Sequence, residues 1–337
     1  MPKTALAFIL RSSGWHQAGL LLLSVLVFIL IAVPLDLQRR VVNDAIGERN
    51  LDTILLLAVA YAGVAAAEGA IKLILNVYRS WISERAVRQL REGTYEFVSQ
   101  LPSRHRPAQV NGVEISIILS ESEPVGAFVG VALSEPVLQG GLLLSVFGYM
   151  VYLQPWMALL SLVVFSPQLV FVPVMQHAIN QSAKARIQTL REVGIAIIAD
   201  PRESGGDPAL QRQRIGRVFE LNMHIFKLKF SMNFLMNLMH HVGVAVVLAL
   251  GGWLAVEGRT DVGTVVAFIS GIAKVNEPWG EVVNWYRDMT VAQVKYRLIA
   301  DAVEALASVT GVPLDPRREA SFAANGERTT SNLDTIV

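Results

Sequence analysis

The sequence predicts an all-α integral membrane protein with about six membrane-spanning helices and long helical extensions on one side of the bilayer. Of its 337 residues, 53% are hydrophobic and only 17% are charged, whereas a soluble domain of this size buries its core with more amphipathic segments. Several charge-poor runs reach the roughly 20 residues that a helix needs to cross a bilayer. Helical patterning also continues past some of these runs into polar sequence, which indicates helices that project into water.

The composition excludes several kinds of site. The chain contains no cysteine, so it has no disulfide framework, no thiol nucleophile and no cysteine metal site. The formal net charge is +1, and we expect no nucleic-acid partner. The first apolar run lacks a small-residue cleavage site and continues to full span length, so we expect a membrane span and not a signal peptide.

The amino-terminal part is expected to lie along the membrane and then to cross it. Residues 1–17 form a cytoplasmic or interfacial segment, in which Lys3–Arg11 is a short amphipathic piece. The first span covers Gly19–Leu37, because this run is almost entirely apolar. A polar loop is expected over Gln38–Asn50.

A second helix is expected from Leu51 to about Leu101, which is far longer than a bilayer requires. Alanines spaced four apart form a ridge on it that lets another helix approach closely. Another face carries the first candidates for a cavity lining, at helical spacing: Glu68, Lys72 and Asn76. An ion pair between Glu68 and Lys72 at the membrane interface is the equally weighted alternative.

The third and fourth spans are expected to form a tight transmembrane hairpin. The third covers about Leu133–Leu153 and the fourth Trp156–Val174, with a minimal turn between them. Pro167 and Pro173 should kink the fourth span, since proline removes a backbone hydrogen bond and clashes with the preceding turn.

The polar sequence between the second and third spans is one long insertion, and a second polar insertion covers Gln176 to about Lys229. Within the second insertion, Asp207–Pro208 supplies an N-cap and a first helical residue. The fifth span covers about Phe234–Val256 and contains His240 and His241. Two adjacent histidines on a helix point in different directions. We therefore expect one satisfied polar contact and one cavity contact, with His240 as the cavity candidate, and no metal ligation.

The sixth span begins near Asp261 and is two-sided. At about 100° per residue, its polar residues fall within an arc of roughly 80°. They are Ser270, Lys274, Glu277, Glu281, Asn284 and Asp288. Ionisable groups inside a membrane are costly unless they face a cavity or each other, so we interpret Lys274 and Glu277 as lining a water-filled path, with Glu281 near its inner boundary. A helix that leaves the membrane early, with solvated charges, is the alternative.

Domain limits and orientation follow from the same patterns. We expect residues 18–303 to form the membrane domain and residues 304–337 to form a disordered tail, since the tail is too polar and too rich in Gly and Pro breaks to fold alone. Most basic residues outside the spans occur in the two long insertions. By the positive-inside rule, these insertions and both termini are expected to be cytoplasmic, in a bacterial-type inner (plasma) membrane.

Three stretches resemble the transmembrane domain of ABC exporter-type (type IV) transporters. The family's second helix, where it leaves the membrane, is similar to RSWISERAVRQLREGTYEFVSQLPSRHRPAQVNGVEISIILSESEPV. The stretch LQPWMALLSLVV resembles the family's tight turn between the third and fourth spans. The stretch GGWLAVEGRTDVGTVVAFISGIAKVNEPW resembles its turn between the fifth and sixth spans. The resemblance covers about Lys3–Val303 and implies a six-span unit that dimerises around a substrate cavity.

The resemblance also implies two short coupling helices that rest on nucleotide-binding domains. They fall at about Ala108–Leu119 and about Asp207–Arg217. Their candidate contact residues are Gly112, Glu114, Asp207, Arg212 and Arg214.

The sequence carries no G-x-x-x-x-G-K-[ST] phosphate loop, and it contains no Gly-Lys pair at all. Without the backbone amides and lysine that hold phosphates, we expect no ATP hydrolysis and no catalytic, cofactor or metal site on this chain. ATP and Mg²⁺ would be bound by a partner ABC nucleotide-binding subunit, and the second transmembrane subunit would be identical or different. The alternatives are a proton-coupled carrier that uses no ATPase, and a truncated transporter that lacks its ATPase domain.

Overall fold

The structure is a computed structural model that describes residues 5–46, 50–99, 121–198 and 208–310. Every regular element in that part of the chain is a helix. The elements are α1 (Ala5–Leu30), α2 (Val33–Arg40), a π-helix (Val41–Ile46), α3 (Leu51–Ser99), α5 (Ser134–Leu153), α6 (Pro155–Phe165), α7 (Gln168–Ile198), α8 (Pro208–Val256) and α9 (Val262–Thr310), and residues 121–131 are also helical. The predicted all-α class is confirmed.

Five helical stretches are long and apolar enough to cross a membrane. They are Ala7–Asn43, Leu51–Glu96, Ser134–Leu153, Pro155–Gly194 and Pro208–Val256, and they correspond to the first five predicted spans. Helix α9 is 49 residues long. It does not qualify among the described residues, because Lys274 and Glu277 interrupt its apolar run, so its crossing stays a prediction.

The described helices belong to two compact units. Of the described residues, one unit holds 5–37, 50–99, 121–146 and 284–310, and the other holds 38–46, 147–198 and 208–283. Helices α5 and α9 therefore each begin in one unit and end in the other.

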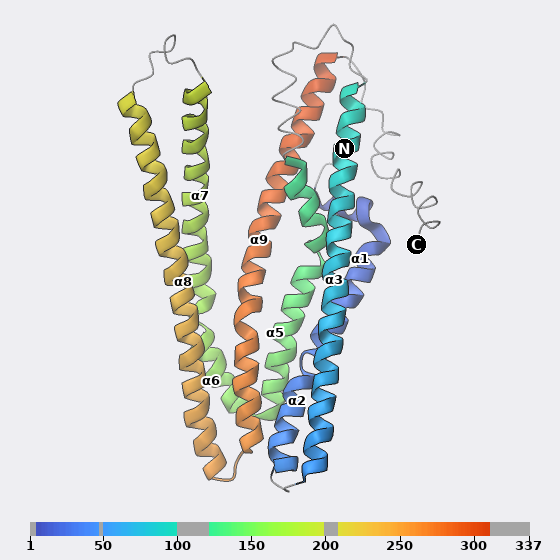
Figure 1. Ribbon diagram of the computed structural model, residues 1–337, viewed down its shortest axis with the longest axis vertical. Coiled ribbons are helices and arrows are strands. Elements are labelled where there is room, and N and C mark those ends of the chain that lie inside the picture. Colours follow the sequence, from blue (N-terminus) through green and yellow to red (C-terminus); the bar gives the residue numbers. More distant parts are fainter. Residues whose placement is uncertain (1–4, 47–49, 100–120, 199–207, 311–337) are drawn as a thin grey trace. The chain divides into compact units, whose positions relative to one another are not determined.

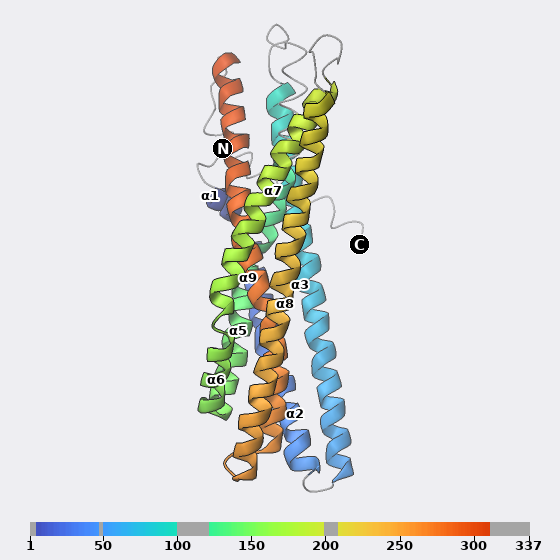
Figure 2. The same cartoon turned by 90° about the vertical axis from the view of Figure 1, so that its left-hand side faces the viewer.

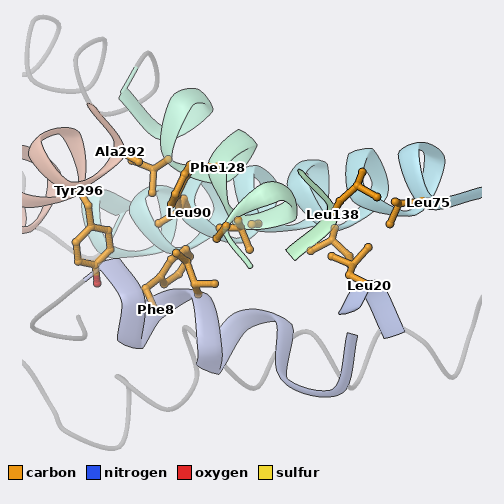
Figure 3. Close-up of a cluster of buried hydrophobic side chains, with 14 of the residues drawn as sticks. Phe8, Leu20, Leu75, Leu90, Phe128, Leu138, Ala292 and Tyr296 are labelled. Atoms are coloured by element: carbon orange, nitrogen blue, oxygen red, sulfur yellow. The ribbon is translucent and has the colours of Figure 1, made fainter. Parts of the chain in front are cut away.

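The core of the first unit joins α1, α3, residues 121–131, α5 and the second half of α9. Figure 3 shows four of the buried side chains gathered in one cluster: Phe8 of α1, Leu90 of α3, Phe128 of the helical residues 121–131, and Tyr296 of α9. The rings of Phe8 and Tyr296 lie 5.6 Å apart. Since burial of one large apolar side chain contributes about 1.5–3 kcal/mol, this cluster fixes the five segments to one another.

Residues 121–131 lie directly on α3 because glycines face it. A Cβ built on Gly130 would lie 2.3 Å from the carbonyl oxygen of Arg79, and one on Gly126 would lie 2.7 Å from the amide nitrogen of Val87. Both obstructing atoms belong to the backbone, so neither can turn aside. Close contact between these helices therefore requires glycine at both positions.

Replacing Gly130 with alanine should destabilise the chain. Overpacking typically costs about 1–3 kcal/mol, and this exceeds the gain of up to about 1 kcal/mol in helix propensity. The melting temperature of the purified chain in detergent measures the effect. Gly140→Ala in α5 is the matched control, because a Cβ there meets nothing within 4 Å. A melting temperature for G130A equal to that of G140A would contradict the close contact.

In the second unit, α7 and α8 form a long antiparallel pair. Figures 1 and 2 show the two helices side by side along much of their length. Three side-chain contacts tie them beyond the apolar packing: Arg186 Nη1 donates to Asn222 Oδ1 at 3.2 Å, Gln211 Nε2 donates to the Val193 carbonyl at 3.2 Å, and Arg214 pairs with Glu192 at 3.7 Å.

Helix α8 also meets α6 and the start of α9, and two glycines permit this approach. A Cβ on Gly251 would lie 2.8 Å from Met157 Cε and 2.9 Å from Val265 Cγ2, and one on Gly243 would lie 3.1 Å from Phe165 Cε2. Small residues at such spacing let helices pack closely where the bilayer gives no hydrophobic drive for association.

The connection between the first two spans differs from its prediction. The expected polar loop over Gln38–Asn50 is helical over most of its length. Its polar side chains find partners at the start of α9: Asn43 Oδ1 accepts the Gly263 N–H at 2.7 Å, and Arg39 pairs with Asp261 at 3.8 Å. These tertiary contacts stabilise a helix where local sequence indicates a loop.

The predicted interruption at Pro167 is confirmed, the kink at Pro173 stays a prediction, and a break at Gly14 that was not predicted from the sequence is also present. Helix α1 has non-helical backbone at Gly14, where φ is 33°, a conformation that favours glycine, and this residue separates the amphipathic start from the first span. Helix α6 ends just before Pro167 and α7 begins just after it, whereas Pro173 lies inside α7. The predicted tail beyond residue 310 lies outside the described residues.

Candidate functional site

Burial confirms the two-sided character predicted for α9. Val265, Phe268, Ile272 and Val275 on its apolar side are each at most 7% exposed. On the other side, Lys274 and Glu281 are half-buried and Glu277 is exposed. The ionisable groups of α9 in the second unit therefore lie outside the core of that unit. Whether this side lines a water-filled path stays a prediction.

His240 lies near the place where α8 meets α6 and α9, because Gly243, one turn later, contacts Phe165 and Ile272. Its side chain is half-buried, and its ring lies 5.3 Å from that of His241 in an edge-on arrangement. The buried Nδ1 of His240 has no hydrogen-bond partner among the described residues. No group of three or more His, Cys, Asp or Glu side chains suited to a metal ion occurs in that part of the chain.

The remaining cavity candidates lie on α3. Glu68 is half-buried, and Lys72 and Asn76 are exposed. All three belong to the first unit, whereas His240 and Glu277 belong to the second. A cavity lined jointly by the two sets stays a prediction.

Sequence reasoning missed a buried ion pair one turn beyond Asn76. Arg79 Nη1 lies 2.6 Å from Glu135 Oε2, and the two side chains are 9% and 14% exposed. Arg79 of α3 and Glu135 in the first turn of α5 are far apart in the sequence, so one sequence alone does not reveal their pairing. A charged residue on each of two otherwise apolar helices is the signal that points to such a pair.

A second missed cluster joins α1 to α3. Arg85 Nη1 lies 3.1 Å from His16 Nε2, and the Tyr78 hydroxyl lies 2.7 Å from His16 Nδ1. Since arginine can only donate, His16 Nε2 must accept; Nδ1 then carries the proton and donates to Tyr78. His16 is therefore neutral in this arrangement. The Arg85 guanidinium also lies 5.4 Å from the centre of the Trp81 ring, a cation–π contact.

The second half of α9 is tied to residues 121–131 and the turn that follows them. Lys295 Nζ lies 2.5 Å from Glu121 Oε2. Trp285 Nε1 donates to the Ala132 carbonyl at 3.0 Å. Neither contact could be predicted from local sequence, because each depends on the packing of distant segments.

The predicted coupling segments are only partly within the described chain. Gly112, Glu114 and Asp207 lie outside it. Arg212 and Arg214 were expected on a short separate helix, but they lie in the first turns of α8, which has 49 residues. No proline interrupts that helix after Pro208, so the extension is continuous with the span. Arg214 contacts Glu192 of α7 and Arg212 is exposed, and their coupling role stays a prediction.

Comparison with known proteins identifies several distant relatives of this chain. A lipid A-core flippase of Methylobacillus flagellatus, named as ATP-dependent, is 26% identical over 281 residues, which are 80% of this chain and 47% of the relative. The flippase of the same name from Syntrophus aciditrophicus is 20% identical over 74% of this chain and 43% of its own. A Bacillus subtilis protein named for multidrug export as an ATP-binding/permease protein is 20% identical over 75% of this chain and 46% of its own.

The chain thus spans about half the length of the curated relatives that it matches. The family described as the ABC transporter transmembrane region matches residues 17–197. The match begins in α1, ends near the end of α7, and covers most of the first apolar stretch and all of the next three. The multi-pass helical architecture and the family match lead to one conclusion: this chain belongs to the ABC transporter transmembrane region family.

Proposed function

We propose that this chain is the membrane-spanning subunit of an ABC exporter, and that a separately encoded ATPase drives it. The observation that carries the proposal is the length of its helices. Helices α3, α8 and α9 each have 49 residues, which is about 73 Å at about 1.5 Å per residue, whereas the hydrocarbon core of a bilayer is about 30 Å thick. Roughly 40 Å of each helix is available outside the membrane to meet another protein.

The mechanism would be alternating access, in which ATP-driven closure of the partner ATPase moves the helical extensions. The pairing of α7 with α8 supports this, since the Arg186–Asn222 hydrogen bond and the hydrogen bond from Gln211 to the Val193 carbonyl hold the two extensions together. A displacement at their ends would then reach the membrane through two linked helices. In this proposal the extensions are cytoplasmic.

We further propose that the apolar part of α3 packs against a second transmembrane subunit. None of its most apolar stretch is buried within this chain. Leu55, Leu56 and Val59 are 64–70% exposed, and the ridge of alanines nearby would let another helix approach closely. Lipid alone would also cover this face, so the stoichiometry of the purified complex distinguishes the two.

Affinity purification of the chain from its own host in mild detergent tests the proposal. We expect an ATPase with a phosphate loop to co-purify, and Mg²⁺-dependent ATP hydrolysis to follow that subunit. As a control, Arg212 and Arg214 in the proposed second coupling segment are both replaced with glutamate. This variant should lose the ATPase and keep its melting temperature. Hydrolysis by this chain alone, or transport with no ATPase attached, would contradict the proposal.

A further inference from the structure

An apolar groove lies between α6 and α8, at the end of the second unit that carries the turns at Gln154 and Arg259. Its volume is about 460 Å³. Trp156, Leu159 and Val163 of α6 form one wall, and Leu250 and Trp253 of α8 form the other. Gln154 and Arg259 lie at its polar edge.

The groove is open on the side away from the contact between α6 and α8. Beside it, α6 and α8 approach each other closely, because Gly251 leaves room for Met157. On the groove side, Leu159, Val163 and Trp253 are 51%, 57% and 52% exposed. The helices therefore touch along one side and leave an unfilled apolar channel along the other.

A polar hollow of about 310 Å³ adjoins this groove, since Gln154 and Arg259 line both. Arg39, Thr260 and Asp261 also line the hollow, and two arginines against one aspartate leave a formal charge of +1 there. The nearest carboxylate to Arg259 is that of Glu257, at 3.6 Å with both side chains exposed. That distance is longer than a hydrogen bond, and exposed pairs of this kind are weak.

The dimensions and side chains match one leaflet of a bilayer. From Trp156 to Val163 the α6 wall rises about 10 Å, and one leaflet of hydrocarbon is about 15 Å thick. Trp156 and Trp253 lie within a few residues of the helix ends, where tryptophan is enriched at the boundary between lipid and water. Arg259 and Thr260 follow the end of α8 in the sequence, so a bilayer boundary at the tryptophans would place them beside the lipid headgroups.

We propose that the groove and the hollow form one binding site for an anionic phospholipid, separate from any path for an exported substrate. An acyl chain lies against Leu159 and Leu250. The phosphate accepts hydrogen bonds from Arg259 and Arg39. A planar guanidinium group suits this role because it can donate two parallel hydrogen bonds to two oxygens of one phosphate. Thr260 and Gln154 supply further polar contacts for the headgroup.

Quenching of tryptophan fluorescence by brominated lipids tests this site directly. The chain that keeps Trp156 and Trp253, with its other tryptophans changed to Phe, is reconstituted in phosphatidylcholine vesicles. Brominated phosphatidylglycerol is then compared with brominated phosphatidylcholine at equal mole fraction. We expect about a fivefold preference for phosphatidylglycerol, since one basic residue near an anionic membrane surface contributes about 1 kcal/mol to the binding free energy, which corresponds to about that ratio. Equal quenching by the two lipids would show non-selective contact only and would overturn the proposal.

Matched substitutions separate the site from general surface charge. Arg259→Gln should bring the preference close to one, whereas Arg40→Gln, a change of equal charge outside the groove and the hollow, should leave it unchanged. Leu250→Phe, which fills the groove, should reduce quenching by both lipids, and Leu248→Phe on the same helix should not. Equal effects of R259Q and R40Q, or of L250F and L248F, would overturn the site.

A second measurement uses the unmodified chain and does not depend on any substitution. A ligand that binds only the folded state raises its stability by mass action. Phosphatidylglycerol should therefore raise the melting temperature in detergent more than phosphatidylcholine does at the same concentration. Equal melting temperatures would count against a specific site.

Discussion

Replacing Glu135 with leucine should lower the free energy of unfolding by about 3–5 kcal/mol, because it leaves the guanidinium of Arg79 buried without its carboxylate. The two atoms lie 2.6 Å apart and both side chains are almost fully covered. Desolvation of an unpaired arginine is costly, and no other acidic side chain in the described residues forms an ion pair with Arg79. Thermal unfolding of the purified chain in detergent measures the loss.

Two companion variants distinguish this effect from a general sensitivity to lost charge. Glu92→Leu removes the partner of Arg88 from a pair whose side chains are 64% and 55% exposed, and it should change the stability by only about 0.5 kcal/mol. The double variant R79M/E135L removes both buried charges and should recover most of the loss, since apolar replacement of a buried pair is often neutral. A melting temperature for E135L equal to that of E92L would contradict the buried pair.

If Glu277 lines the predicted substrate path, replacing it with glutamine should reduce transport of cationic substrates about tenfold or more and leave the stability unchanged. A hydrogen bond to a charged group contributes about 1.5–3 kcal/mol, and about 1.4 kcal/mol corresponds to a factor of ten. Glutamine keeps the shape of the side chain and removes only its charge. Because Glu277 is exposed within this chain, its neutralisation should not disturb the fold. Transport into inverted vesicles and thermal unfolding are measured on the same preparation.

The outcome of the E277Q experiment separates three roles. If Glu277 mainly supports Lys274 one turn earlier, the variant should melt earlier and transport should follow the amount of folded protein. If the chain is a proton-coupled carrier, transport should proceed with no ATPase, should collapse with an uncoupler and should be lost in the variant. Glu84→Gln, an exposed change of equal charge on α3, is the control. Normal transport together with normal stability would mean that Glu277 is only solvated.

The sequence predicts most of the helical framework because its signals are local and repeated. The unbroken patterning after Leu51 predicted one helix running far beyond the bilayer, and α3 ends at Ser99. Gln154 and Pro155 predicted the tight turn before α6, and Pro208 predicted the start of α8. In each case a few neighbouring residues determine the backbone.

The polar contacts could not be predicted in the same way, because each joins residues that are distant in the sequence. Nothing near Arg79 identifies Glu135 as its partner, and nothing near His16 indicates Arg85. The helix over the predicted loop has the same cause: Asn43 is a turn-favouring residue, and it is held in a helix because its side chain accepts the Gly263 N–H. Such choices are made by tertiary structure and not by local preference.

The length of the α7–α8 pair has a mechanical consequence. If α8 pivots where it leaves the bilayer, an arm of roughly 40 Å turns a rotation of about 5° into a displacement of about 3.5 Å at its far end. Motion can also pass from the far end of the arm to the membrane. A small force applied at the far end then acts as a larger force over a shorter distance on the spans near the pivot. A motor attached there would need to move only a few ångströms, and the stiffness of the paired helices α7 and α8, which the Arg186–Asn222 and Gln211–Val193 hydrogen bonds join, would set how much of that stroke is lost to bending.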